Sequence, residues 1–326
     1  MLKKATGVMM ITFLTLGLFG GQAFAGKKFM SLGTGSPAGT YYFIGAGFSS
    51  IWNKYIREIK VVAESTAASA ENVALISRGK MDMGIASSSA VLRAKELGKL
   101  DLKRLRILCS STYGSHFHII TRKKSSIKSY LDLKGKRVSY GPPGSGTLVS
   151  AREMIKAWGM TEKDFNMKYL SFSEVITAIR DKTLDAGLIA AAAPVASIVD
   201  LTLTVPIRLL PVTREQFKFP NKVTDCYADI VIPGGTYKGV DMDIATVASP
   251  TFIVINRDVK AETAYKLLKV LYEHEKEKNA IHPSSKEFNP QAAFAGVVGR
   301  AAYFIPYHEG AVKFFKEAKL WPKSGM

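Results

Sequence analysis

The chain has 326 residues, 47% of them hydrophobic, and a formal net charge of +18. A typical single domain holds roughly 100–150 residues, so this length predicts two lobes. Two cysteines exclude a disulfide-built scaffold. Cys109 and Cys226 lie in apolar sequence and are expected to be buried thiols, although a bridge between them stays open.

Residues 1–25 have the pattern of a secretory signal peptide. Lys3 and Lys4 precede an uncharged apolar run that ends at Phe19, and Ala23-Phe24-Ala25 follows. We expect cleavage after Ala25, because the apolar run is short for a membrane anchor. The remaining chain would be exported, with a net charge of +16. Its basic residues are spread along the sequence, which favours a solvated surface over nucleic-acid binding.

Strand and helix patterns alternate along the rest of the chain, which predicts an α/β protein with a mostly parallel sheet flanked by helices. Strands are expected at 29–32, 60–63, 81–86, 104–109, 117–120, 137–140, 168–170, 186–190, 207–211 and 251–255. Helices are expected at 43–52, 70–80, 90–97, 148–158, 173–181, 261–278 and 310–318.

The last predicted strand, 251–255, is expected to return to the first lobe. Lobe 1 would then contain residues 26–115 and 238–326, and lobe 2 residues 116–237. Crossing segments near 113–118 and 232–237 would act as a hinge.

Two glycine-rich loops, 33–42 and 141–147, each join a predicted strand to a predicted helix. Glycine lets the backbone approach a ligand closely, and the peptide N–H groups that open a helix favour an anion. The second loop lacks the lysine of a phosphate-binding P-loop, and the first lacks the spacing of a dinucleotide fingerprint. The loops therefore predict a small polar ligand held between two lobes, with plain strand-to-helix turns as the alternative.

Candidate ligand-binding residues come from these loops and from the ends of two neighbouring elements. Asn72 can donate to and accept from a ligand, or it can cap its helix. Ser87 and Ser88 follow a strand at its carboxyl end, where open α/β sheets bind ligands. The complete set is Thr34, Gly35, Ser36, Gly39, Thr40, Tyr41, Asn72, Ser87, Ser88, Ser145, Gly146 and Thr147.

Catalytic and metal-binding patterns are weak in this sequence. There is no G-x-S-x-G nucleophile elbow and no spacing typical of a closed metal site. His116 and His118 alternate on a predicted strand, so only one can face a given side, and His308 is expected to fix a turn. We therefore expect a binding protein rather than an enzyme, with no cofactor and no metal.

Several sequence blocks, in order along the chain, resemble the solute-binding proteins of TRAP transporters, TAXI family. The blocks are 33–35 with 39–42, Glu71-Asn72, 131–138, 144–147, 232–237 and 308–311. The resemblance implies a two-lobed periplasmic binding protein fold, type II-like, with the ligand in the interlobe cleft. It also implies a monomer that delivers a glutamate- or 2-oxoglutarate-like solute to the membrane subunits of a TRAP transporter.

This chain departs from the family pattern at two places near the expected site. Ala67 and Ala68 stand where the family commonly has two glycines, and Ser87-Ser88-Ser89 replaces a frequent Gln-Ser-Asp. These changes put the identity of the ligand in doubt. Neither loop contains an aspartate, so the sequence favours an anionic organic acid over an amino acid. The alternatives are a binding protein that presents its ligand to a membrane sensor and an exported hydrolase or transferase on the same fold.

Overall fold

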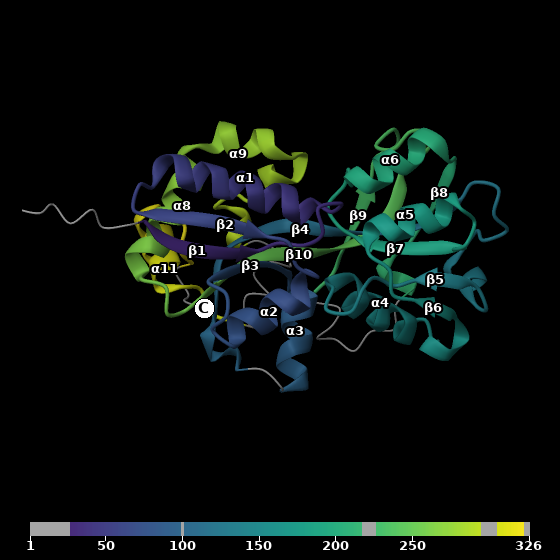
Figure 1. The fold of residues 1–326 in the computed structure, drawn as a ribbon, viewed down its shortest axis with the longest axis horizontal. Helices are drawn as coiled ribbons and strands as arrows, with labels where there is room; N and C mark the ends of the chain where they lie inside the picture. Colours follow the sequence, from purple (N-terminus) through teal and green to yellow (C-terminus); the bar gives the residue numbers. More distant parts are fainter. Residues whose placement is uncertain (1–26, 99–100, 217–225, 295–304, 323–326) are drawn as a thin grey trace, which may run out of the picture.

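A computed structural model describes residues 27–98, 101–216, 226–294 and 305–322, so the expected signal peptide lies outside the described residues. The protein has two α/β lobes placed side by side (Figure 1). No helix in the described part of the chain is long and apolar enough to cross a bilayer.

The first lobe is built around three parallel strands. These strands are β1 (Lys28–Gly33), β2 (Ile59–Glu64) and β3 (Met83–Ser87), with β1 between the other two. Its helices are α1 (Thr40–Tyr55), α2 (Ser69–Ser77), α3 (Ser88–Leu97), α8 (Ala261–Glu273), α9 (Glu275–Ile281) and α11 (Glu309–Glu317). The predicted helix 261–278 is divided at His274, whose backbone angles (φ −107°, ψ 43°) are not helical.

The second lobe holds short strands covered by helices on both faces. Its strands are β5 (Arg137–Ser139), β6 (Asn166–Lys168), β7 (Ala186–Ala190), β8 (Ile207–Leu210) and β9 (Ala228–Ile232), and its helices are α4 (Gly146–Ala157), α5 (Phe172–Arg180) and α6 (Ala196–Thr204). Short 3₁₀ turns lie at Leu102–Arg104, Tyr130–Leu133, Glu162–Asp164, Arg214–Gln216, Pro283–Glu287 and Ala292–Phe294. Neither α6 nor β9 was predicted from the sequence.

Two long strands, β4 (Leu105–Arg122) and β10 (Ile244–Asn256), run through both lobes. Ser111 of β4 still pairs with β10, whereas Phe117 pairs with β7, so β4 crosses between the lobes where the first hinge segment was expected. It is one continuous strand rather than the two expected. Because β10 runs antiparallel to β3, β4 and β9, the sheet is mixed rather than mostly parallel.

The expected return crossing at 232–237 is wrong. Ile232, Tyr237 and Val240 are buried in one hydrophobic cluster of the second lobe, and Val247 lies in another. The chain returns inside β10 instead, where the pairing with β4 shifts register between Ser249 and Thr251. Gly114 allows β4 to lie against this point, because a Cβ at position 114 would come within 2.5 Å of the Thr251 side chain.

Both cysteines are buried and free, as the sequence predicted. Burial raises the pKa of the Cys109 thiol to about 12. Cys109 packs in the core of the first lobe with Trp52, whose indole N–H donates to the carbonyl of Leu267 at 2.8 Å. The cysteines therefore contribute to packing in the two lobes.

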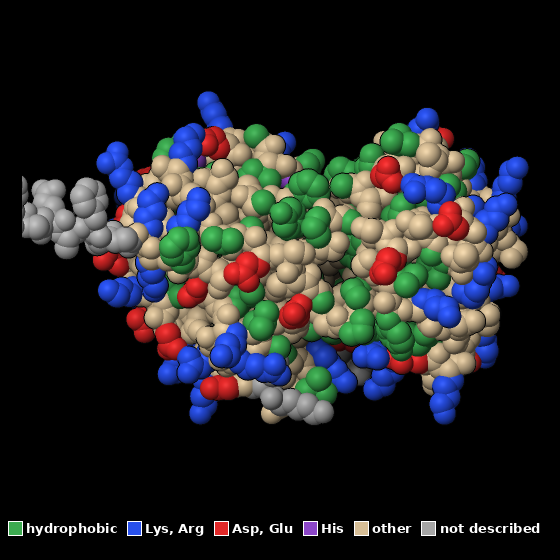
Figure 2. All heavy atoms as spheres, viewed as in Figure 1, with side chains coloured by type: hydrophobic (Ala, Val, Ile, Leu, Met, Phe, Trp, Pro, Cys, Tyr) green, Lys and Arg blue, Asp and Glu red, His purple; other side chains and the backbone are tan. Residues whose placement is uncertain are grey.

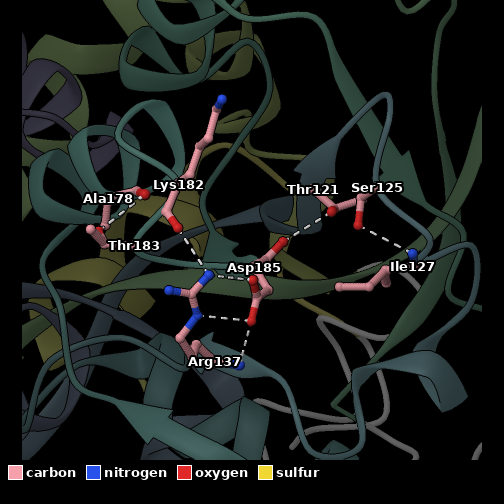
Figure 3. A network of polar contacts seen from close by, with 8 residues as sticks. All are labelled: Thr121, Ser125, Ile127, Arg137, Ala178, Lys182, Thr183 and Asp185. Atoms are coloured by element: carbon pink, nitrogen blue, oxygen red, sulfur yellow. Dashed lines mark hydrogen bonds and ion pairs between the residues drawn. The ribbon is translucent and has the colours of Figure 1, made fainter.

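An ion pair between Arg137 and Asp185 ties β5 to the start of β7 in the second lobe (Figure 3). The Asp185 carboxylate accepts from the Arg137 backbone N–H at 2.9 Å and from its guanidinium at 3.0 and 2.6 Å. The Asp185 carbonyl accepts from Thr121 of β4 at 2.9 Å. The Arg137 hydrogen bond lowers the pKa of Asp185.

Asp185→Asn should lower the free energy of unfolding by about 1–3 kcal/mol at pH 7, because Arg137 loses a charged acceptor. Because the pKa of Asp185 is lower in the folded state than in the unfolded state, its ionised carboxylate stabilises the protein at pH values above its unfolded-state pKa of about 4. This stabilisation is lost as the pH falls through the folded-state pKa. The deficit should therefore shrink at pH 3, as measured by urea unfolding at both pH values. Asp200→Asn, in the exposed Arg180–Asp200 pair, is the control and should change little. An equal deficit at both pH values would contradict this assignment.

Candidate functional site

A cavity of about 220 Å³ lies where the two lobes meet, lined by loops from both. Figure 2 shows hydrophobic side chains beside this junction and Lys and Arg side chains around the outer rim of both lobes. The lining residues are Gly35, Ser36, Pro37, Gly39, Thr40, Tyr41, Ser65, Thr66, Ala67, Ala68, Ser69, Ser115, Pro142, Ser145, Gly146, Thr147, Ser171, Phe172, Ala190 and Ala191. None of these described residues has a charged side chain.

The first glycine-rich loop supplies one wall, as the sequence predicted for Gly35, Ser36, Gly39, Thr40 and Tyr41. Helix α1 starts directly after Gly39, an extended residue that offers no side-chain cap, so its first N–H groups need other partners. Gly39 also allows the second lobe to approach, because a Cβ there would lie 3.1 Å from the Phe172 ring.

The second glycine-rich loop supplies the opposite wall, and all three of its predicted residues line the cavity. Ser145 caps helix α4 by accepting from the Leu148 N–H at 3.1 Å. Thr147 accepts from the Ala190 N–H at 3.2 Å, which holds the loop against β7. A Cβ on Gly146 would come within 2.6 Å of the Ser69 hydroxyl in the first lobe.

Two more helices begin at the same cavity. Ser69 is the first residue of α2 and Phe172 the first of α5, and both line it. Together with α1 and α4, the positive ends of four helix dipoles therefore meet there, two from each lobe. This arrangement makes the cavity electropositive without any basic side chain in its described lining.

Four predicted site residues do not line the cavity, although all are buried there in the first lobe. Thr34 donates to the Glu64 carbonyl at 2.7 Å, Ser87 caps α3, and Ser88 bonds the Ser249 hydroxyl at 3.0 Å. Asn72 donates to the carbonyls of Gly33, Thr34 and Ile85. Their polar groups bond the protein itself, so their predicted ligand contacts are corrected to structural roles.

The sequence reasoning missed the loop 65–69 and the start of α5. Loop 65–69 follows β2, which lies beside β1 in the same parallel orientation, so its carboxyl end meets the cavity edge too. The expectation that ligands bind at the carboxyl ends of sheet strands, which predicted Ser87 and Ser88, also predicts this loop. Ser171 and Phe172 open a helix whose capping box was visible in the sequence. No pattern in the sequence indicated that Ser115, Ala190 and Ala191 line the cavity.

The histidines expected to be structural have that role. Tyr237 accepts at its hydroxyl from the Val195 N–H at 3.0 Å and lies 2.9 Å from Nε2 of His118, so its proton is donated to that nitrogen. Burial lowers the pKa of His118 to about 3, which keeps the ring neutral. His308 caps α11 by accepting from the Gly310 N–H at 3.2 Å.

A larger depression of about 820 Å³ lies at the outer end of the second lobe, and Figure 3 labels Ser125, Arg137, Lys182 and Asp185 of its lining. It is lined by Arg122, Lys123, Lys124, Ser125, Arg137, Lys182, Leu184, Asp185, Thr204, Val205 and Pro206. All belong to one lobe, so lobe closure would not enclose a solute there. The interlobe cavity is the candidate binding site.

The model of the NMT1-like family matches residues 32–318. The chain belongs to the NMT1-like family. Its fold is similar to an ancestral arginine-binding protein bound to arginine, with 16% identity over 80% of this chain and 98% of the other and a TM-score of 0.50. It is similar to a protein from Bordetella bronchiseptica RB50, with 15% identity, 92% and 86% coverage and a TM-score of 0.50. The periplasmic aliphatic sulphonate binding protein SsuA from Escherichia coli also matches, with 16% identity over 91% of this chain and 94% of the other and a TM-score of 0.48. The likeness to the arginine-binding protein shows the two-lobed periplasmic binding protein fold.

The lobes of this NMT1-like protein touch through hydrogen bonds around the cavity. The Gly144 carbonyl accepts from the Ala70 and Glu71 N–H groups of α2, each at 3.1 Å. Thr40 donates to the Ala192 carbonyl at 2.8 Å, and His282 donates from Nε2 to the Pro194 carbonyl at 3.1 Å. These contacts describe a closed arrangement of the lobes.

Gly146→Val should prevent this closure without unfolding the NMT1-like protein, because the new side chain would collide with Ser69 across the cavity. Wild-type protein should contract in small-angle scattering when saturated with solute, and the variant should keep its unliganded radius of gyration. Lys156→Val, at an exposed position of the same helix, is the control. Wild-type contraction in Gly146→Val would remove this loop from the closing contact.

The carboxyl group of Glu153, in α4, should make the stability of the folded protein depend on pH. It accepts from the Tyr227 hydroxyl at 2.6 Å, and burial raises its pKa to about 7. The folded state therefore binds this proton more tightly than the unfolded state, and stability from this group falls as pH rises from about 4.5 to 7. Glu153→Gln keeps the acceptor and should raise Tm relative to wild type more at pH 8 than at pH 5. The same Tm difference at both pH values would contradict the raised pKa.

Proposed function

We propose that this protein is a periplasmic solute-binding protein that captures a small carboxylate between its lobes and delivers it to the membrane subunits of a TRAP transporter, TAXI type. The observation that carries the proposal is the meeting of four helix N-termini at one cavity that has no charged side chain in its described lining.

An anionic group is the solute chemistry that this cavity favours. Each helix N-terminus is equivalent to about half a positive charge, and backbone N–H groups of the first turn point out of the helix. Helix α1 has no side-chain cap, so its first N–H groups are available to a ligand, whereas the Ala70 and Glu71 N–H groups of α2 already donate to the Gly144 carbonyl. Hydroxyls of Ser36 and Ser115 add donors, each worth about 1.5–3 kcal/mol net when the acceptor is charged.

No described residue that lines the cavity offers a carboxylate to an ammonium group. Two acids close in sequence to the lining residues bind backbone N–H groups: Glu71 accepts from the Ala67 N–H at 2.5 Å, and Glu174 accepts from the Ser171 N–H at 2.7 Å. An unpaired ammonium group buried in the cavity would be costly. This favours an organic acid over an amino acid.

Apolar surface for a short carbon skeleton comes from both lobes. Tyr41 from the first lobe and Phe172 from the second both line the cavity, and a 3.0 Å hydrogen bond joins the hydroxyls of Tyr41 and Thr251. Ala190 and Ala191 complete this surface with small side chains. A solute with an anionic head and a compact body fits these walls.

Transport is supported by the family-ordered sequence blocks together with membership of the NMT1-like family. The signal-peptide pattern at 1–25 supports export to the periplasm, where the monomer would meet its membrane partner. Genes for large permease subunits next to the gene of this protein would favour transport over presentation to a sensor.

A thermal-shift screen should show stabilisation by 2-oxoglutarate or succinate above that by glutamate, glutamine or neutral sugars. A solute at 100 times its Kd adds about 2.7 kcal/mol to the free energy of unfolding. Stabilisation by sugars alone, or by cationic amino acids alone, would refute an anionic solute. Stabilisation by alkanesulfonates but by no carboxylic acid would support an anionic solute and refute the proposal that this solute is a carboxylate. Turnover of an ester, amide or phosphate would favour an exported hydrolase or transferase.

A further inference from the structure

Ala68, on the cavity wall, has backbone angles that an alanine rarely adopts. Its φ is +79° and its ψ is −139°. This pair lies outside the left-handed helical region and beside the region of positive φ and extended ψ that proteins reserve for glycine. The methyl group of Ala68 is therefore retained against a conformational cost that glycine would not have.

The surrounding hydrogen bonds fix this conformation. The Ala68 N–H donates to the Thr66 hydroxyl at 3.0 Å, and the Ala68 carbonyl accepts from the Asn72 N–H at 2.9 Å. Thr66 in turn bonds the Asn72 side chain at 2.8 Å. Strained residues persist where neighbours determine them in this way, and they concentrate at ligand-binding sites.

The Ala68 methyl group lies where it limits the cavity. A Cβ built on Gly35, in the first glycine-rich loop, would come within 3.2 Å of it. Gly35 and Ala68 both line the cavity, so the methyl group narrows the space between loop 33–39 and loop 65–69. A glycine at position 68 would remove both the strain and this restriction.

We infer that Ala68 is a specificity-determining residue, whose strained methyl group sets the upper size of the solute accepted between the lobes. This inference rests on the proposed solute-binding function and adds a size limit to it. A well-placed methyl group in an apolar wall changes discrimination between homologous ligands by roughly 10- to 200-fold.

The test compares Ala68→Gly with wild type and with Lys182→Gly. Lys182 also has a positive φ, of 62°, but lies at the outer end of the second lobe, so its replacement relieves strain away from the cavity. Thermal unfolding without solute measures the strain. Calorimetric titration with succinate and 2-methylsuccinate, and with 2-oxoglutarate and its 3-methyl derivative, measures the size limit.

Ala68→Gly should raise Tm by about 2–4 °C without solute and should improve binding of each methylated acid relative to its parent by about 10-fold or more. Lys182→Gly should raise Tm and leave that ratio at the wild-type value. An unchanged ratio in Ala68→Gly, with wild-type protein binding the parent acid, would overturn the inference, and so would a lower Tm. Failure of wild type to bind any acid would instead overturn the proposed function, while the Tm comparison would still decide the strain.

Discussion

The side-chain amide of Asn72 holds the first lobe's part of the site together, and a narrow slot between two strands makes its position possible. Gly33 of β1 and Gly84 of β3 are register partners. A Cβ on Gly33 would lie 2.4 Å from the Asn72 oxygen, and one on Gly84 would lie 2.8 Å from the Asn72 Cβ. Asn72 enters this slot from α2 and donates to three carbonyls, which orients the carboxyl ends of both strands.

The same residue connects that slot to the cavity wall. Its oxygen accepts from Thr66, and Thr66 supports the strained backbone of Ala68. The first N–H groups of the helix that carries Asn72 donate to the Gly144 carbonyl of the other lobe. One helix therefore positions the wall in its own lobe and receives the second lobe on closure.

Charge is distributed differently at the surface and in the cavity. The exported chain is expected to have a net charge of +16, and its basic side chains lie mostly around the outer rim of the visible face (Figure 2). Such a surface attracts anions over long range and is screened by salt. Inside the cavity the polarity comes from backbone dipoles and hydroxyls, which are fixed in direction and desolvated at little cost. Attraction and recognition thus depend on separate groups.

The sequence by itself determined the α/β alternation and the two glycine-rich loops, because helix periodicity, strand patterns and glycine are local properties. Tyr41, Thr40 and Gly146 could be placed at the site for that reason. Tertiary structure decided which neighbouring polar groups face the cavity. Asn72 and Ser88 have the donors and acceptors of ligand-binding residues, but their side chains bond strands from distant parts of the chain instead. It also decided where β10 returns between the lobes, since that depends on pairing with the distant strand β4, and that Ala68 has a positive φ, which its hydrogen bonds to Thr66 and Asn72 fix.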